Sequence, residues 1–384
     1  MNSGNHTVVQ AQDLQALIDA LRQRGYEVLG PTVQDGAIVY DTIEAIDELP
    51  IGWTDEQEGG TYRLKRRDDQ AFFGYTLSPQ SWKRFLHPPR RQLWSATRNG
   101  TANQVVFKQD IAAQPRYAFF GMRSCELQAV AIQHTVFTQG PFVDPHFKHL
   151  HDNAFRIAVQ CGQAGNTCFC VSMKTGPRAI DGFDLALTEF IDSERHCFLV
   201  EVGSQRGAEL LNEVPYTWAS EQDIRAAHEI TDRTSRLMGR SMPSNLKEFL
   251  YTNVNHPRWD EIATRCLACC NCTTVCPTCF CGTTEDVTDI TGEQTERWLR
   301  WDSCFTTEFS YIHGGSVRAS VRGRYRQWMT HKLAAWIDQF GTSGCVGCGR
   351  CIVWCPVGID ITAEIAAMRA SDDISVEISA LNMV

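Results

Sequence analysis

The stretch "CLACCNCTTVCPTCFC", residues 266–281, places seven cysteines close together. Its pattern C-x2-C-x2-C-x3-C-P occurs a second time at residues 345–356. Three cysteines at two-residue gaps can wrap around one [4Fe–4S] cubane, whereas the fourth ligates the other cluster of a pair. We therefore predict two [4Fe–4S] clusters with interleaved ligands. The first set is Cys266, Cys269, Cys272 and Cys355, and the second is Cys345, Cys348, Cys351 and Cys276.

Zinc is the alternative for cysteine pairs of this spacing, since structural zinc sites also use Cys-x2-Cys. Zinc requires neither a third cysteine at the second gap nor the proline that follows the fourth. Both features occur here, and both occur twice. The pattern therefore favours iron–sulfur clusters.

The bulk composition limits the class of protein. The chain has 384 residues, 43% of them apolar, and a formal net charge of −9, which argues against nucleic acid as a partner. No apolar run approaches the roughly 18–20 residues that cross a membrane, and the N-terminus does not resemble a secretory signal. We expect a cytoplasmic protein, in which 17 cysteines indicate metal ligation and not disulfides.

The order of apolar runs predicts an α+β fold in three parts. Short apolar runs at 116–122, 155–161 and 196–203 suit buried strands, so we expect a mixed α/β domain over residues 1–203. A helical connector is expected over 204–260, with Ser220 as a helix-capping residue. A ferredoxin-like domain with two clusters follows at 261–384, with a long insertion at 282–340.

Nine cysteines lie outside the two sets. Cys197 lies in an apolar strand and is expected to be a core residue, and Cys270 either packs in the core or beside a cluster. A third [4Fe–4S] cluster is our hypothesis for Cys125, Cys161, Cys168 and Cys170, because residues 168 and 170 point the same way in an extended chain. A competing group, Cys279, Cys281 and Cys304, lacks an obvious fourth ligand. In the third alternative, both groups are buried thiols that shield the predicted pair.

Other motifs are informative by their absence. The sequence contains no G-x-G-x-x-G after a strand, no G-x-x-x-x-G-K-[ST] and no H-E-x-x-H, so no nicotinamide, flavin or nucleotide site is readable. The insertion carries a basic run at 318–332. It suits either a docking patch for an acidic partner or a solvated helix face.

Several segments together resemble a known family. The family is the iron–sulfur β subunit of cytosolic NAD(P)-linked [NiFe] hydrogenases, the sulfhydrogenases. The resemblance is carried by "GMRSCELQAV" (121–130), "CFCVSMKTGP" (168–177), "GFDLALT" (182–188), "WDSC" (301–304) and "GCVGCGRCIVWCPVGID" (344–360). They are also similar to the iron–sulfur subunit of anaerobic sulfite reductases. Two residues depart from the family pattern: Lys174 stands where glycine is usual, and Cys270 where a small residue without a thiol is usual.

The resemblance implies a subunit without a catalytic centre. Such a subunit relays electrons between a flavin subunit that handles NAD(P)H and the small and large hydrogenase subunits, so a hetero-oligomer is expected. It also implies that seven of the extra cysteines are ligands or guard the clusters, namely Cys125, Cys161, Cys168, Cys170, Cys279, Cys281 and Cys304. The iron–sulfur subunit of a sulfite reductase is one alternative, and a structural or assembly protein with non-transferring clusters is another.

Overall fold

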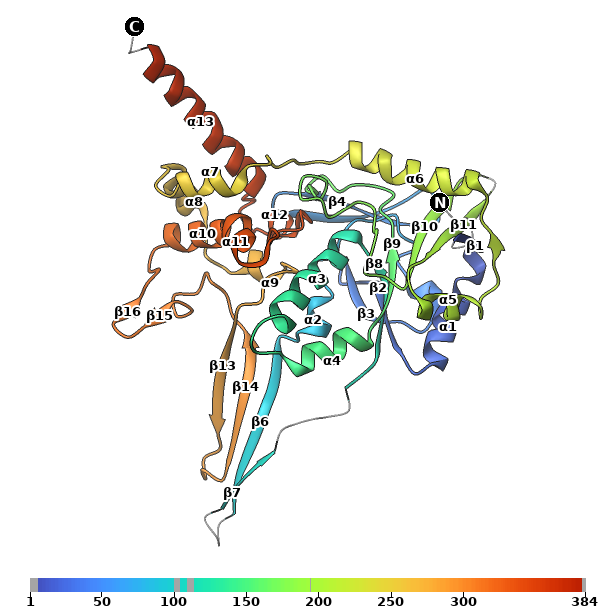
Figure 1. Ribbon diagram of the computed structural model, residues 1–384, viewed down its shortest axis with the longest axis horizontal. Helices are drawn as coiled ribbons and strands as arrows, with labels where there is room; N and C mark the ends of the chain where they lie inside the picture. Colours follow the sequence, from blue (N-terminus) through green and yellow to red (C-terminus); the bar gives the residue numbers. More distant parts are fainter. Residues whose placement is uncertain (1–5, 100–103, 109–113, 194, 382–384) are drawn as a thin grey trace.

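The computed structural model describes residues 6–99, 104–108, 114–193 and 195–381 (Figure 1). Its N-terminal part is built on an eight-stranded sheet in the order β12-β1-β11-β10-β9-β8-β2-β3. Strands β2, β8, β9 and β10 run parallel, and antiparallel strands complete both sides. The bounds are β1 (His6–Gln10), β2 (Glu27–Gln34), β3 (Ala37–Thr42), β8 (Tyr117–Met122), β9 (Phe155–Val159), β10 (Leu185–Ile191), β11 (His196–Val202) and β12 (Thr217–Trp218).

Helices cover both faces of this sheet, because its central strands are apolar on both sides. Helices α1 (Gln15–Gln23) and α5 (Gln205–Leu211) lie over one buried cluster, and α2 (Lys83–Leu86), α3 (Ser124–Thr138) and α4 (Pro145–Asn153) lie over another. The strands expected at 116–122, 155–161 and 196–203 are present in this sheet as β8, β9 and β11.

The helical connector is shorter than we predicted. Strand β12 pairs with β1, and α5 packs against α1, so the segment that follows residue 203 still belongs to the N-terminal layer. The boundary moves because residues 205–211 bury an apolar face on that layer. Helices α6 (Glu221–Arg236), α7 (Leu246–Thr252) and α8 (Arg258–Arg265) then lead to the cysteine-rich part. Ser220 caps α6 as predicted, since its hydroxyl accepts a hydrogen bond from the main-chain N–H of Asp223.

The cysteine-rich part is mainly helical. Two short helices, α9 (Asn271–Thr274) and α12 (Arg350–Val353), each carry the third cysteine of one motif. Around them lie α10 (Val321–Thr330), a π-helical turn (His331–Ala335) and α13 (Ile361–Leu381), which share one apolar core. Helix α11 (Trp336–Phe340) packs into a neighbouring apolar cluster with α3. In both motifs the fourth cysteine follows the short helix.

A four-stranded sheet projects from the body at the lower edge of Figure 1. Its order is β13-β14-β6-β7, with β6 (Arg90–Asn99), β7 (Gln104–Lys108), β13 (Gly282–Thr288) and β14 (Gln294–Trp301). Half of this sheet comes from the N-terminal part and half from the insertion at 282–340, so the insertion is not a separate unit. Small hairpins complete the strand set: β4 (Trp53–Glu58) pairs with β5 (Thr61–Arg66), and β15 (Tyr311–Ile312) with β16 (Gly315–Ser316).

Candidate iron–sulfur sites

The four cysteines of the first predicted set line one cavity. Cys266 follows the last residue of α8, Cys272 lies on α9 and Cys355 follows α12. These three and Cys269 face a cavity whose opposite wall is aromatic, with Phe305, Tyr325 and Trp328. Burial raises the pKa of Cys272 well above its usual value, and the neighbouring thiols at 266, 355 and 269 raise it further. Apposed thiols in an apolar site suit a cubane, which holds ligands as thiolates. Cys269 is exposed, so this site approaches the surface.

The second predicted set is buried deeper. Cys276, Cys345 and Cys348 are each less than 10% exposed. Burial raises the pKa of Cys351, and the charges of Cys345, Cys348 and Cys276 raise it further, so the four thiols converge. Figure 1 shows α9 and α12 side by side, which brings Cys276 of one motif to the other. This is the interleaved arrangement that the spacing predicts.

A buried ammonium group contacts the second set. Lys332 is 6% exposed, and its Nζ donates hydrogen bonds to Cys276 Sγ at 3.2 Å, Thr278 Oγ1 at 3.0 Å and the Gly344 carbonyl at 3.1 Å. Burial lowers the pKa of Lys332, but the charges of nearby cysteines outweigh this and hold the pKa well above its usual value. Lys332 thus remains a cation beside the thiols, in a π-helical turn of the kind often found at functional sites.

The basic residues of the run at 318–332 are buried or half-buried, so the run is not a solvated helix face, and three of its arginines make contacts within the chain. Arg324 is 6% exposed and donates to the Ala319 carbonyl, and Arg322 pairs with Asp260. Arg326 donates to the Val254 carbonyl. These side chains hold α10 against its neighbours.

The four cysteines of the third hypothesised set also line one cavity. Cys125 lies in the first turn of α3, and Cys161 follows β9, so both come from the carboxyl ends of neighbouring parallel strands. Cys168 and Cys170 come from a tight turn and not from the extended segment we expected, yet both face the same cavity. Burial raises the pKa of Cys168 to about 12, with a further contribution from Cys161. The residues fit a four-thiolate set, although no cluster in this position follows from the sequence repeat.

The upstream "TCFC" packs directly on the second motif. The Phe169 N–H donates to the Gly347 carbonyl at 2.8 Å, and Thr175 Oγ1 donates to the Val346 carbonyl at 2.6 Å. Gly347 has φ +65°, and a Cβ there would lie 2.6 Å from the main chain of Phe169 and Cys170. Cys348 of the second set lines the third cavity as well. The second and third sets are therefore neighbours.

A buried ion pair joins the two parts of the chain at this point. Arg350 and Glu126 are each 1% exposed, and Arg350 Nη2 donates to Glu126 Oε1 at 2.5 Å. Glu126 also accepts hydrogen bonds from Tyr40 Oη and Trp82 Nε1. Sequence reasoning did not single out either residue. Their positions next to Cys125 and Cys351 were the available signal.

The members of the competing group, Cys279, Cys281 and Cys304, form two thiol pairs, one of them with Cys276 of the second set. The Cys279 thiol donates to the sulfur of Cys276, which lowers the pKa of Cys276, and Cys304 does the same for Cys281, lowering its pKa to about 7. A second buried lysine, Lys83, donates to the Cys279 carbonyl at 3.3 Å. The group thus borders the second set.

The two single cysteines are also placed. Cys197 is 4% exposed within the apolar cluster over β11, and Cys270 lines the first cavity with a left-handed backbone, φ +69°.

Comparison with known proteins identifies the cysteine-rich part. Residues 265–359 match the model of a 4Fe-4S dicluster domain. Over 337 residues, 87% of this chain and 89% of the relative, the sequence is 28% identical to sulfhydrogenase 2 subunit beta of Pyrococcus furiosus. The chain is a homologue of a sulfhydrogenase beta subunit. Two [4Fe–4S] clusters are its cofactors, as predicted, and the resemblance noted above is confirmed.

These findings support an iron–sulfur subunit that transfers electrons. The relative is, by its name, one subunit of a larger enzyme. Among the residues that the structure describes, none of the helices is both long enough and apolar enough to span a membrane.

Proposed function

We propose that this chain relays electrons between a flavin subunit that handles NAD(P)H and the small and large subunits of a cytoplasmic [NiFe] hydrogenase. In this proposal it has no catalytic centre of its own. The observation that carries the proposal is the succession of cysteine groups. Cys348 belongs to the second set and lines the third cavity, while Cys272 of the first set lies near Cys304 and Cys351. Bound clusters would supply one-electron redox chemistry, and the residues described here hold them close together.

The ligand assignments belong to the same proposal. Cys266, Cys269, Cys272 and Cys355 hold the first cluster, and Cys345, Cys348, Cys351 and Cys276 hold the second. Cys125, Cys161, Cys168 and Cys170 hold a third, because all four line one cavity. The remaining group, Cys279, Cys281 and Cys304, then shields the second cluster, since its members pair with each other or with Cys276.

Iron and acid-labile sulfide per chain test this assignment, on protein purified without oxygen. Three clusters give about twelve of each, and two give about eight. Replacing Cys168 with Ala should lower iron by about four, whereas Cys197→Ala, in a purely apolar setting, should leave it unchanged. If the Cys168 variant kept about twelve irons per chain and Cys281→Ala lost some of them, the third cluster would instead be assigned to the competing group.

Two alternatives share these sites and differ in partner or role. In an anaerobic sulfite reductase the electrons would pass to a sirohaem subunit, and co-purification of a nickel–iron or a sirohaem subunit separates the two. If the clusters are structural, reduction with dithionite will not be followed by electron transfer to a flavoprotein. Transfer that is lost in Cys348→Ala supports the relay.

A further inference from the structure

One cavity of the N-terminal part lies away from the ferredoxin-type sets. Its volume is about 670 Å³, within the range of roughly 300–1,000 Å³ that small-molecule sites occupy. One wall is formed by residues 160–163, after β9, and by residues 188–192, at the end of β10. These are the carboxyl ends of two parallel strands, which is where open α/β sheets bind ligands.

The cavity exists because β10 extends beyond the carboxyl end of β9. Strand β9 pairs with β10 only as far as Val159 and Leu187, and the chain then turns away at Gln160. Residues 188–191 continue past this point with one edge no longer covered by β9. Helix α6 forms the opposite wall through Ala226, Glu229, Ile230, Arg233 and Arg236.

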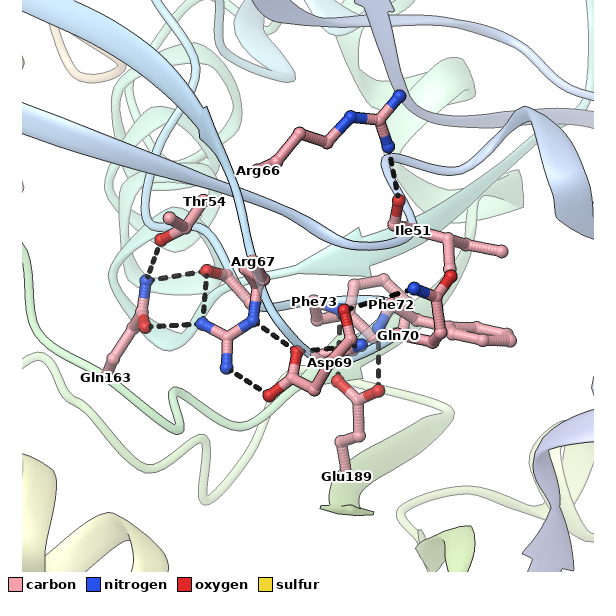
Figure 2. Close-up of polar contacts among 12 residues, drawn as sticks. Ile51, Thr54, Arg66, Arg67, Asp69, Gln70, Phe72, Phe73, Gln163 and Glu189 are labelled. Atoms are coloured by element: carbon pink, nitrogen blue, oxygen red, sulfur yellow. Dashed lines mark hydrogen bonds and ion pairs between the residues drawn. The ribbon is translucent and has the colours of Figure 1, made fainter. Parts of the chain in front are cut away.

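The floor of the cavity is a closed hydrogen-bond network, shown in Figure 2. Arg67 forms two 2.6 Å bonds to the Asp69 carboxylate and donates to Gln163 Oε1 at 3.2 Å. Gln163 Nε2 donates to the Gly74 carbonyl at 2.7 Å. Glu189 accepts the N–H groups of residues 72 and 73 at 2.7 and 3.0 Å. Each group has its partner inside the protein, so this floor is preorganised before any ligand enters.

The charges at the mouth differ from those of the floor. Arg195 is paired with Asp192 and Asp223. Arg233 and Arg236, three residues apart on α6, are both exposed, and within the described part of the chain neither side chain has an ion pair or a hydrogen bond. Over the whole lining the charges balance, because four arginines (67, 195, 233 and 236) stand against four carboxylates (69, 189, 192 and 229). The mouth therefore offers two free guanidinium groups on α6, within a lining that is neutral as a whole.

We propose that this cavity binds a small organic anion of mononucleotide size, whose phosphate or carboxylate group is held by Arg233 and Arg236. Guanidinium groups suit these anions because their donors match two oxygens at once. The sequence has no glycine-rich phosphate loop, so side chains and not a helix N-terminus hold the anion. Gln163 also lines the third cysteine cavity, which places the ligand one side chain away from that site.

Isothermal titration of the anaerobically purified chain, with its clusters in place, tests this inference. The probes are flavin mononucleotide, 5′-AMP and citrate, which separate phosphate from carboxylate recognition. We expect saturable 1:1 binding of at least one probe, weakened at least tenfold in the double variant Arg233→Ala/Arg236→Ala and partly restored in Arg233→Lys/Arg236→Lys. Arg225→Ala is the matched control, because Arg225 lies on the same helix, pairs with Glu221 and does not line the cavity.

Two results would overturn the inference. One is the absence of saturable binding of all three probes up to about 1 mM, since weaker binding would be non-specific. The other is binding that is equally strong in the double variant and in the Arg225 control. Iron content is measured on the same samples, and it is expected to be unchanged by every α6 variant. A failure of the cluster assignments would change iron and not probe binding, so the two failures are distinguishable.

Discussion

Removal of the Lys332 charge should lower the reduction potential of the second cluster. The Nζ atom lies 3.2 Å from Cys276 Sγ, and the positive charge stabilises the extra electron of the reduced state. At this distance and an effective dielectric constant of about 20, two full charges interact by about 5 kcal/mol. The added electron spreads over the whole cluster, so we take a fifth to a half of that energy. The expected shift is then about −45 to −110 mV in Lys332→Met.

Redox titration followed by electron paramagnetic resonance measures this shift. The second cluster is recognised as the signal that is absent in Cys348→Ala but present in Cys168→Ala. Lys332→Arg keeps the charge and should move the potential much less. Lys148→Met removes an exposed lysine that pairs with Asp152 and should have almost no effect, because solvent screens it. If all three lysine variants gave the same potential within about 20 mV, the electrostatic role of Lys332 would be refuted.

Three further predictions follow from the backbone and the ion pairs. Gly347→Ala should lose about four irons per chain, because its Cβ would lie 2.6 Å from the main chain of the upstream "TCFC". Gly341→Ala is the control for backbone strain, because Gly341 has a similar φ and a Cβ there would contact nothing. Lys174→Gly should stabilise the chain by about 0.5 kcal/mol in urea unfolding, because Lys174 has φ +58°, and a loss of stability would contradict this. Burial raises the pKa of Asp144, but its hydrogen bonds to Arg91 outweigh burial and lower the pKa. The ionised carboxylate of Asp144 therefore stabilises the fold above about pH 4, and this stabilisation is lost in acid. Asp144→Asn should therefore lower the urea midpoint at pH 7 by the equivalent of about 1 kcal/mol, with a smaller difference at pH 3; an equal difference at both pH values would exclude the ion pair as the cause.

The sequence was most informative where one local pattern carries the chemistry. Ligand spacing predicted the two interleaved sets because a cubane accepts only a few loop geometries. The apolar run at 116–122 predicted β8, and the cap at Ser220 predicted the start of α6. Each of these signals depends only on residues that are close together in the sequence. The left-handed conformation of Lys174 explains why glycine is usual there in the resembling family.

Long-range pairing was beyond such reasoning. Strand β6 pairs with β14, about two hundred residues later, and nothing in either segment specifies its partner. Lys332 was grouped with a basic run because its charge is visible in the sequence, whereas its burial depends on how α10 and the π-helical turn pack. The start of the connector was misplaced for the same reason, since the two-residue strand β12 is recognisable only from its pairing with β1.

The contact between the upstream "TCFC" and the second motif has a consequence for assembly. Gly347 and Gly349 have left-handed φ values and lie against the main chain of residues 167–170, so this wall of the third cavity takes its shape from the second motif. The buried Glu126–Arg350 pair fixes the same junction, and removal of one partner of such a pair leaves an uncompensated charge that costs about 3–5 kcal/mol. The third site should therefore be complete only after the second motif has folded around its cluster. Loss of the second cluster in Cys348→Ala should then also reduce occupancy of the third, whereas loss of the third in Cys168→Ala should leave the second in place, and iron counts per chain distinguish the two orders.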